Sequence, residues 1–306
     1  MKVLIATQKP FAAVAVEGIK SILTEAGHEV ALLEKYPAQE DLLAAVADVE
    51  ALIIRSDKVT AEVIAAAPKL KIVVRAGAGF DNVDLAAATA AGVVVMNTPG
   101  QNSNAVAELA IGLMIYMART QFTPATGSEI EGKRLGIQAF GNVGRLVGAK
   151  AKALGMKVSA IDPFLPDEKI IAGGAEPAAS LEALYAGSDY LSIHIPATPE
   201  TIGSIGYDLV VSMPKGATLI NTARKEVIDE AGLARALRER PDLKYAADVA
   251  PDSYDALREE FGLRIFATPK KMGAQTSEAN INAGLAAARQ IVSFFSTGDT
   301  RFQVNK

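Results

Sequence analysis

The sequence predicts an α/β fold built on parallel β-sheets, and three observations support this prediction. Short apolar segments alternate with helix-forming segments along all 306 residues. Strands that lack polar alternation are typical of parallel sheets covered by helices on both faces. A glycine-containing loop joins one such strand to a helix. The length suggests two domains or one large α/β unit.

A first series of elements runs from the N-terminus to residue 97. We expect its strands at Val3–Ala6, Glu29–Leu33, Ala51–Arg55, Lys71–Arg75 and Val93–Asn97. We expect its helices at Ala13–Ala26, Asp41–Ala47, Ala61–Ala66 and Val83–Ala91. Glycine and proline cluster between residues 97 and 102, which predicts a loop and a hinge. The long helix Ala105–Arg119 follows this hinge.

A second α/β series starts at Arg134, after a polar stretch at 120–132 that is rich in helix breakers. We expect its strands at Leu135–Phe140, Lys157–Ile161, Tyr190–Ile193, Thr218–Asn221, Tyr245–Asp248 and Ile265–Thr268. Its clearest helices are Val143–Leu154 and Glu230–Glu239, and Ala279–Ser296 forms the final helix of the chain.

The composition excludes several classes of protein. Half of the residues are hydrophobic and 22% are charged, so the chain can bury a full core. The net charge is −4 and the basic residues are scattered, so neither nucleic acid nor an anionic membrane is an expected partner. There is no cysteine, which excludes disulfides and thiolate metal sites, and no other metal site is apparent. Apolar runs are too short for a signal peptide or a membrane span, so we expect a cytoplasmic, soluble protein.

The loop after the first strand of the second series has the pattern A-x-G-x-x-G, from Ala139 through Gly141 to Gly144. Gly141 lets the backbone approach a pyrophosphate, and Gly144 lets the helix pack closely on the sheet. The first turn of that helix offers free N–H groups and a positive dipole end to phosphates. We therefore expect a dinucleotide site whose phosphate-binding residues are Phe140, Gly141, Asn142, Val143 and Gly144.

An acidic residue stands where such a site needs one. The strand Lys157–Ile161 is followed by Asp162, 18 residues after Gly144. A carboxylate there can accept hydrogen bonds from the adenosine ribose and repels a 2′-phosphate, which favours NAD over NADP. The alternative is a plain strand–helix turn in which Asp162 only caps the loop before Pro163.

Four longer stretches resemble the D-2-hydroxyacid dehydrogenase family. They lie at 75–84 (RAGAGFDNVD), 102–108 (NSNAVAE), 192–201 (SIHIPATPET) and 213–224 (MPKGATLINTAR). The resemblance covers both series of elements and is strongest to members that act on D-3-phosphoglycerate and lack a C-terminal regulatory domain. It implies NAD-dependent oxidation of D-3-phosphoglycerate to 3-phosphohydroxypyruvate, a step of serine biosynthesis.

The same resemblance implies two Rossmann-like doubly wound domains with the active site in the cleft between them. Residues 1–98 with 281–306 would bind the substrate, and residues 99–280 would bind NAD. Members of the family are usually homodimers, and the helix at 104–119 would lie at the dimer interface. The stretch 120–132 is shorter than the arm that usually reinforces this interface, which weakens the expectation of a dimer.

Residue roles follow from matching positions in the family. The arginine of the motif N-T-A-R, Arg224, would hold the substrate carboxylate, which a guanidinium grips bidentately. Ser56, Ala76, Gly77 and Asn102 would line the substrate pocket, where the turn at Gly77 and Gly79 exposes backbone N–H groups. The cofactor would further contact His194, Pro196, Thr201, Thr222, Ala223, Asp248, Gly273 and Ala274, with Asp248 at the nicotinamide amide.

Two arginines favour a phosphorylated substrate independently of the resemblance. Arg55 and Arg75 each end a strand of the first series, at the sheet edge where open α/β folds bind ligands. Lys9 follows the first strand at the same edge. Guanidinium groups there suit a phosphate. The alternative is that one of them pairs with a nearby acid such as Asp57 or Asp81.

The chain departs from the family at its acid–base pair. The family's histidine normally follows a T-P dipeptide, but here Pro269 is followed by Lys270 and Lys271, and the partner glutamate is replaced by Ser253. The only histidines, His28 and His194, lie at unrelated positions. We hypothesise that Lys270 or Lys271 is the acid–base group. A lysine base needs a pKa far below about 10.4, which burial and the loss of a neighbouring carboxylate both favour.

Three alternatives remain open at this stage. The two lysines can be ordinary solvated side chains. The substrate can be another 2-hydroxy acid, as in glyoxylate, hydroxypyruvate or D-lactate enzymes. The chain can also be a non-catalytic protein that binds and senses NAD, because the acid–base pair of the family is missing.

Overall fold

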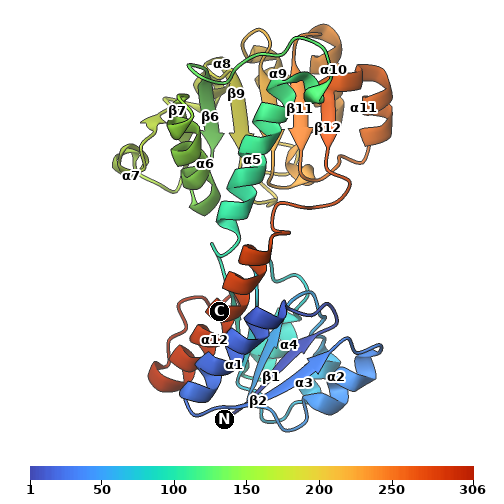
Figure 1. The fold of residues 1–306 in the computed structure, drawn as a ribbon, viewed down its shortest axis with the longest axis vertical. Helices are drawn as coiled ribbons and strands as arrows, with labels where there is room; N and C mark the ends of the chain where they lie inside the picture. The colour runs from blue at the N-terminus through green and yellow to red at the C-terminus, as the bar shows by residue number, and fades with distance from the viewer. The chain divides into compact units, whose positions relative to one another are not determined.

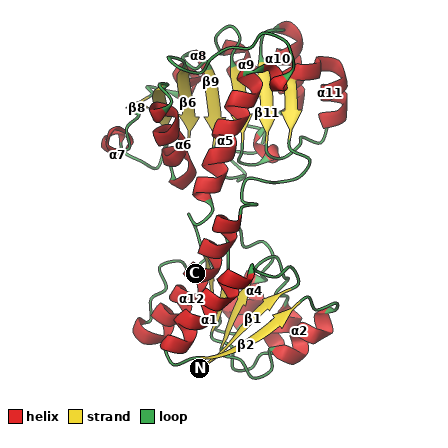
Figure 2. Ribbon diagram, viewed as in Figure 1, coloured by secondary structure: helices red, strands yellow, loops and turns green.

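The computed structural model describes all residues from Met1 to Lys306 and divides them into two compact units. Unit 1 comprises Met1–Asn102 and Gln275–Lys306, and unit 2 comprises Ser103–Ala274. Each unit is built on one sheet whose strands are all parallel, with helices against it (Figure 2). The predicted fold class, two α/β domains on parallel sheets, is confirmed. Which unit binds the substrate and which the cofactor stays a prediction.

The sheet of unit 1 has five strands in the order β2-β1-β3-β4-β5. The strands are β1 (Lys2–Thr7), β2 (Glu29–Glu34), β3 (Ala51–Ile54), β4 (Ile72–Arg75) and β5 (Val94–Asn97). The helices are α1 (Ala13–Glu25), α2 (Gln39–Ala45), α3 (Ala61–Ala65), α4 (Leu85–Ala90) and α12 (Ser277–Thr297). Helices α1 and α12 lie side by side, so the end of the chain packs against its beginning (Figure 1).

Alternate residues of the unit 1 strands serve two separate cores. Val3 and Ile5 of β1 pack into the core beneath α1 and α12, whereas Leu4 and Ala6 pack into the core beneath α2, α3 and α4. All four residues of β3 are buried. The lack of polar alternation in the sequence therefore reflects strands that are covered on both faces.

The sheet of unit 2 has seven strands in the order β12-β11-β10-β9-β6-β7-β8. The strands are β6 (Arg134–Gln138), β7 (Lys157–Ile161), β8 (Glu176–Pro177), β9 (Tyr190–Ile193), β10 (Thr218–Asn221), β11 (Lys244–Ala247) and β12 (Ile265–Ala267). The helices are α5 (Ser103–Ala118), α6 (Asn142–Ala153), α7 (Asp167–Ala172), α8 (Leu181–Ala186), α9 (Tyr207–Ser212), α10 (Glu230–Glu239) and α11 (Tyr254–Phe261). Short 3-10 turns occur at Thr120–Phe122, Lys225–Val227 and Gly262–Arg264.

Unit 2 also has two cores. One lies beneath α5 and α6, which run next to each other (Figure 1), and contains Ile137, Phe140 and Met114. The other lies beneath helices α8 to α11 and contains Tyr185 and Tyr245. No helix of the chain is both long enough and apolar enough to cross a lipid bilayer.

Several predicted boundaries were wrong by one or two residues, and the errors share a cause. The predicted strands ended at Phe140, Asp248 and Thr268, but the observed strands end at Gln138, Ala247 and Ala267. Backbone hydrogen bonds to the neighbouring strand continue past the assigned ends, because the N–H groups of Ala139, Asp248 and Thr268 donate to the carbonyl oxygens of Ile161, Asn221 and Ala247. The two-residue edge strand β8 was not predicted, because so short a segment carries no periodicity.

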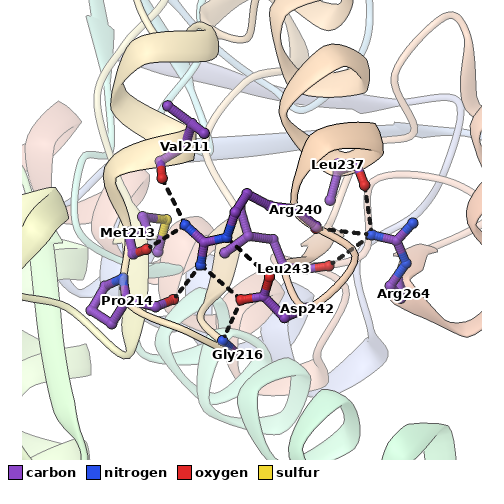
Figure 3. A network of polar contacts seen from close by, with 9 residues as sticks. All are labelled: Val211, Met213, Pro214, Gly216, Leu237, Arg240, Asp242, Leu243 and Arg264. Atoms are coloured by element: carbon purple, nitrogen blue, oxygen red, sulfur yellow. Dashed lines mark hydrogen bonds and ion pairs between the residues drawn. The ribbon is translucent and has the colours of Figure 1, made fainter.

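A polar brace joins the segments that precede β10, β11 and β12 (Figure 3). The Arg240 guanidinium donates hydrogen bonds to the carbonyl oxygens of Val211 (2.8 Å), Met213 (3.1 Å) and Pro214 (3.3 Å). It also donates to both carboxylate oxygens of Asp242, which holds the pKa of that carboxyl well below its ordinary value. Asp242 in turn accepts from the Gly216 N–H.

Arg264 extends the brace from the other side. Its guanidinium donates to the carbonyl oxygens of Leu237 (2.8 Å) and Arg240 (3.3 Å), where helix α10 ends (Figure 3). Carbonyl groups at a helix end have no partner within the helix, so two arginines satisfy groups that would otherwise need water.

Candidate functional site

The glycine loop of unit 2 joins β6 to α6 and leaves its N–H groups available. Ala139 has a left-handed backbone with φ of 74°. Gly144 packs so closely that a Cβ there would lie 2.2 Å from the Ala139 carbonyl oxygen. The N–H groups of Asn142, Val143 and Gly144 find no acceptor within the protein. This geometry matches the close approach and the free helix N-terminus that a pyrophosphate requires.

Asp162 is attached to this loop. Its carboxylate accepts hydrogen bonds from the Phe140 N–H and the Phe164 N–H, both at 2.9 Å. The Arg145 Nε donates to the Phe140 carbonyl oxygen at 3.2 Å, so the backbone of Phe140 is held at both its N–H and its carbonyl group. Two of the roughly four acceptor positions of the carboxylate are therefore used, and the others remain for ribose hydroxyls. The structure thus includes the capping contact of the alternative interpretation without excluding the ribose contact.

His194 lies beside the glycine strand in a largely buried setting. Its Nε2 lies 2.9 Å from the Ser192 hydroxyl, and its Nδ1 lies 3.4 Å from the Thr222 hydroxyl. Burial lowers the pKa of His194 to about 3. The imidazole is therefore neutral near pH 7 and a weak proton acceptor. Thr201 folds the following segment on itself by donating to the Pro196 carbonyl oxygen at 2.6 Å.

The turn that carries Arg224 is fixed by a residue that sequence reasoning did not select. Asn221, 2% exposed, donates from Nδ2 to the Arg224 carbonyl oxygen and accepts at Oδ1 from the Ala223 N–H, both at 2.9 Å. The Arg224 guanidinium is exposed, donates to the Ala223 carbonyl oxygen and makes no ion pair. No salt bridge occupies this guanidinium, which is therefore available for an anionic ligand.

The segment that carries the two lysines is tied to Asp248. This carboxylate is 1% exposed and accepts hydrogen bonds from the N–H groups of Met272 (2.7 Å) and Gly273 (2.8 Å). The Thr268 hydroxyl lies 3.0 Å from the same carboxylate and 2.8 Å from the Lys270 carbonyl oxygen. Both lysine side chains are exposed. The burial expected for a lysine base is therefore not present in this conformation.

Ser253, which stands where the family has its glutamate, is held by hydrogen bonds to Glu230. The Ser253 N–H and hydroxyl both donate to the Glu230 carboxylate, which also accepts from the Asp252 N–H. Asp252 pairs with Lys225 and its side chain is 80% exposed. The turn at 252–253 is thus held by a carboxylate from α10 and presents no glutamate of its own.

In unit 1, Arg55 directly follows β3 and Arg75 is the last residue of the neighbouring strand β4. The Arg55 guanidinium donates to the Lys9 and Pro10 carbonyl oxygens (3.2 and 3.0 Å) and to the Asn280 side chain, and it stacks 5.2 Å from the Phe11 ring centre. Arg75 donates from Nε to the Arg55 carbonyl oxygen at 3.0 Å. Its Nη groups have no partner. Burial lowers the pKa of both arginines, and the nearby carboxylates of Asp57 and Asp81 oppose this effect at Arg55 and Arg75 respectively. For Arg75 the charge of Arg55 adds a smaller lowering.

Neither arginine forms an ion pair, so the pairing alternative is absent. Asp57 is 4% exposed and accepts from the Gln8 N–H (2.6 Å), the Tyr36 hydroxyl (2.7 Å) and the Arg55 backbone N–H (3.2 Å). It therefore supports the backbone at Arg55 and acts on the guanidinium through its charge, without a salt bridge. Two guanidinium groups thus share one sheet edge with the carboxylates of Asp57 and Asp81 nearby but without a salt bridge, and a bound anion would be favourable there.

The glycine turn of unit 1 corrects one expectation. The Gly77 N–H is not free, because it donates to the Thr98 hydroxyl at 2.7 Å. Gly77 has φ of 145°, and a Cβ would lie 1.7 Å from Arg75 Nη1, so this glycine makes room for the Arg75 guanidinium. The N–H groups of Ala78 and Gly79 make no hydrogen bond and are the available donors. Of the other predicted pocket residues, Ala76 is buried, Asn102 is partly buried and Ser56 is exposed.

Comparison with known proteins places this chain in a family. Residues 6–305 match the family described as D-isomer specific 2-hydroxyacid dehydrogenase, catalytic domain. The chain belongs to this family.

Three similar proteins are all named as 3-phosphoglycerate dehydrogenases. The chain is similar to a 3-phosphoglycerate dehydrogenase of Entamoeba histolytica, solved with NAD⁺ bound, at 49% identity and a TM-score of 0.86, covering 100% of this chain and 99% of that one. It is 36% identical to D-3-phosphoglycerate dehydrogenase of Methanocaldococcus jannaschii over 89% of this chain and 57% of that protein. It is 37% identical to the enzyme of the same name from Rattus norvegicus, covering 89% and 54%. The chain spans about half the length of these two relatives.

Proposed function

We propose that the chain is an NAD-dependent dehydrogenase that oxidises D-3-phosphoglycerate to 3-phosphohydroxypyruvate. The observation that carries this proposal is the pair of guanidinium groups without a salt bridge, Arg55 and Arg75, at one sheet edge of unit 1. Their partly buried charges need an anion, and a phosphate accepts several charge-assisted hydrogen bonds at once. The names of the relatives support the same substrate. A role in serine biosynthesis follows from this substrate.

The glycine loop, its free N–H groups and Asp162 fit the cofactor. Asn142, Val143 and Gly144 would bind the pyrophosphate, and the free oxygen lone pairs of Asp162 would bind the ribose. A bound nicotinamide supplies the acceptor for the hydride. His194, Pro196, Thr201, Thr222, Ala223 and Ala274 would border the cofactor. Arg224 would hold the substrate carboxylate, because its guanidinium is exposed and without a carboxylate partner.

Lys270 or Lys271 would exchange the proton of the substrate hydroxyl. In the reductive direction an ammonium is already a competent acid. In the oxidative direction the amine must be neutral, which the exposed position seen here does not favour. Turnover that rises from neutral to alkaline pH is therefore expected. Replacing each lysine by Met should abolish turnover in one variant with NADH affinity unchanged. Two active variants would refute this role.

A substrate panel tests the main proposal. NADH formation should be fast with 3-phosphoglycerate and at least about tenfold slower, as kcat/KM, with D-glycerate and D-lactate. A preference for an unphosphorylated acid would instead favour a glyoxylate, hydroxypyruvate or D-lactate enzyme. NADH binding without turnover on any acid would favour a non-catalytic NAD-sensing protein. The missing Glu–His pair is the observation behind that second candidate.

The assembly and location remain predictions. We propose a homodimer formed through the region 104–119, where α5 lies. Measuring the mass of the chain in solution tests this proposal, and a monomer at all concentrations would contradict it.

A further inference from the structure

We infer that Asn280 is a positioning residue that determines specificity, because its neutral amide holds the Arg55 guanidinium in place without cancelling the charge that an anionic substrate needs. This inference rests on the proposed function, since it assigns the phosphate of the substrate to this guanidinium. Asn280 lies near the start of α12 and Arg55 directly follows β3. Two residues 225 positions apart in the sequence therefore meet within unit 1.

The hydrogen bonds of the Arg55 guanidinium all go to neutral oxygen atoms. Its Nη1 donates to the carbonyl oxygens of Lys9 (3.2 Å) and Pro10 (3.0 Å), and its Nη2 donates to Asn280 Oδ1. The centre of the Phe11 ring lies 5.2 Å from the guanidinium carbon. A guanidinium has five N–H donors, so two remain for a ligand. The group is thus held in place while it keeps its full positive charge.

The orientation of the Asn280 amide is fixed by a second contact. Its Nδ2 donates to the Thr276 carbonyl oxygen at 2.9 Å, so the oxygen is the atom that faces Arg55. The reverse orientation would place two donors against each other and an acceptor against a carbonyl group. Thr276 itself caps α12, because its hydroxyl accepts from the Ala279 N–H at 3.1 Å. The capped start of α12 therefore presents a neutral acceptor to the guanidinium.

The buried carboxylate beside Arg55 makes no hydrogen bond to the guanidinium. Asp57 acts on this group through its charge, while its oxygens accept from the Gln8 N–H, the Tyr36 hydroxyl and the Arg55 backbone N–H. A carboxylate in direct contact would occupy the donors and offset the charge that attracts a phosphate. Asparagine and aspartate have the same shape, so an amide-to-carboxylate change at Asn280 would create that contact.

Two variants of the full chain separate the charge of this position from its packing. In Asn280→Ala the guanidinium loses one acceptor but keeps its charge, and KM for 3-phosphoglycerate should rise about three- to tenfold. In Asn280→Asp a carboxylate meets the guanidinium, and KM should rise at least about thirtyfold with kcat within about threefold. KM for D-glycerate, which has no phosphate, should stay within about threefold in both variants.

The order of the two losses is the decisive readout. A residue that only supports the fold would tolerate Asn280→Asp, which keeps the shape, better than Asn280→Ala. A loss in Asn280→Ala that equals or exceeds the loss in Asn280→Asp would therefore overturn the inference, as would equal losses with D-glycerate.

Asn282→Asp is the matched control. Asn282 is exposed on the same helix, so this variant adds the same charge two residues away. Its KM for 3-phosphoglycerate should stay within about threefold of the unaltered chain. A rise as large as in Asn280→Asp would mean that any negative charge on α12 weakens the substrate, and it would also overturn the inference.

Binding measured without turnover distinguishes failure of this inference from failure of the proposed function. Titration calorimetry of the chain saturated with NADH gives the Kd of 3-phosphoglycerate directly. If Asn280→Asp raises this Kd at least about thirtyfold but the unaltered chain oxidises no acid, the proposed function fails and the inference stands. If the chain oxidises 3-phosphoglycerate and all variants share one Kd, the inference alone fails. If the chain does not bind 3-phosphoglycerate, both fail.

Discussion

Replacing Arg75 by Met should remove the preference for a phosphorylated substrate. The Arg75 Nε is occupied by the Arg55 carbonyl oxygen, but its two Nη groups have no partner and can each donate to a phosphate. A hydrogen bond to a charged group contributes about 1.5–3 kcal/mol, so two of them contribute about 3–6 kcal/mol. Arg55 remains beside the site and offsets part of this loss, which favours the lower end of the range.

The expected kinetic effect follows from that energy. At about 1.4 kcal/mol for each factor of ten, kcat/KM for 3-phosphoglycerate should fall by about 10²-fold or more. For D-glycerate, which lacks the phosphate, it should change by less than about threefold. The assay is initial-rate NADH formation with both substrates, beside Arg75→Lys, which keeps the charge but not the fork and should recover part of the activity.

Two results would refute this reasoning. An equal loss with both substrates would mean that Arg75 supports the fold of the glycine turn and does not read the phosphate. No loss with either would mean that the phosphate does not bind at this sheet edge. Thermal unfolding of the variant distinguishes a folding defect from a binding defect.

Three further predictions concern unit 2. Arg240→Met should destabilise the unit by about 2–4 kcal/mol, because it leaves three carbonyl groups and the Asp242 carboxylate without their donor; an urea midpoint at neutral pH that does not move would contradict the brace. Ala139→Gly should stabilise the chain by up to about 1 kcal/mol, since Ala139 has φ of 74°, and a lower unfolding temperature would contradict that account. Burial lowers the pKa of His194 to about 3 in the folded state, from about 6.5 in the unfolded chain. Its contribution to the free energy of unfolding is therefore fully present above about pH 6.5 and is lost as the pH falls toward 3. His194→Asn should flatten that part of the plot of unfolding free energy against pH, and an unchanged slope would count against this account.

The fold could be predicted because each strand and helix carried a local signal. Strands such as β3 are buried on both faces and therefore appear as continuous apolar runs. The glycine loop was predictable for the same reason, since Gly144 reports a close approach that only glycine allows. The ends of the strands were less predictable, because Asp248 and Thr268 still donate backbone hydrogen bonds to the neighbouring strand although the assigned strands end one residue earlier.

The contacts that fix the site residues were not predictable from the sequence. Arg55 is held by Asn280, 225 positions away, and no local pattern indicates this contact. Asn221 belongs to the motif that was singled out for Arg224, but its role as the support of the turn follows only from its two hydrogen bonds. The Gly77 N–H was expected to be free and is not, because Thr98 comes from the next strand end to accept it. Long-range partners of this kind depend on the folded topology.

The central claim is that this chain oxidises a phosphorylated 2-hydroxy acid, and one measurement tests it most directly. Purified chain, NAD and 3-phosphoglycerate are mixed, the appearance of NADH is followed from neutral to alkaline pH, and D-glycerate serves as the matched substrate without phosphate. The account predicts turnover that depends on the phosphate and rises with pH. Equal turnover of both acids, or NADH binding with no turnover of either, would contradict it.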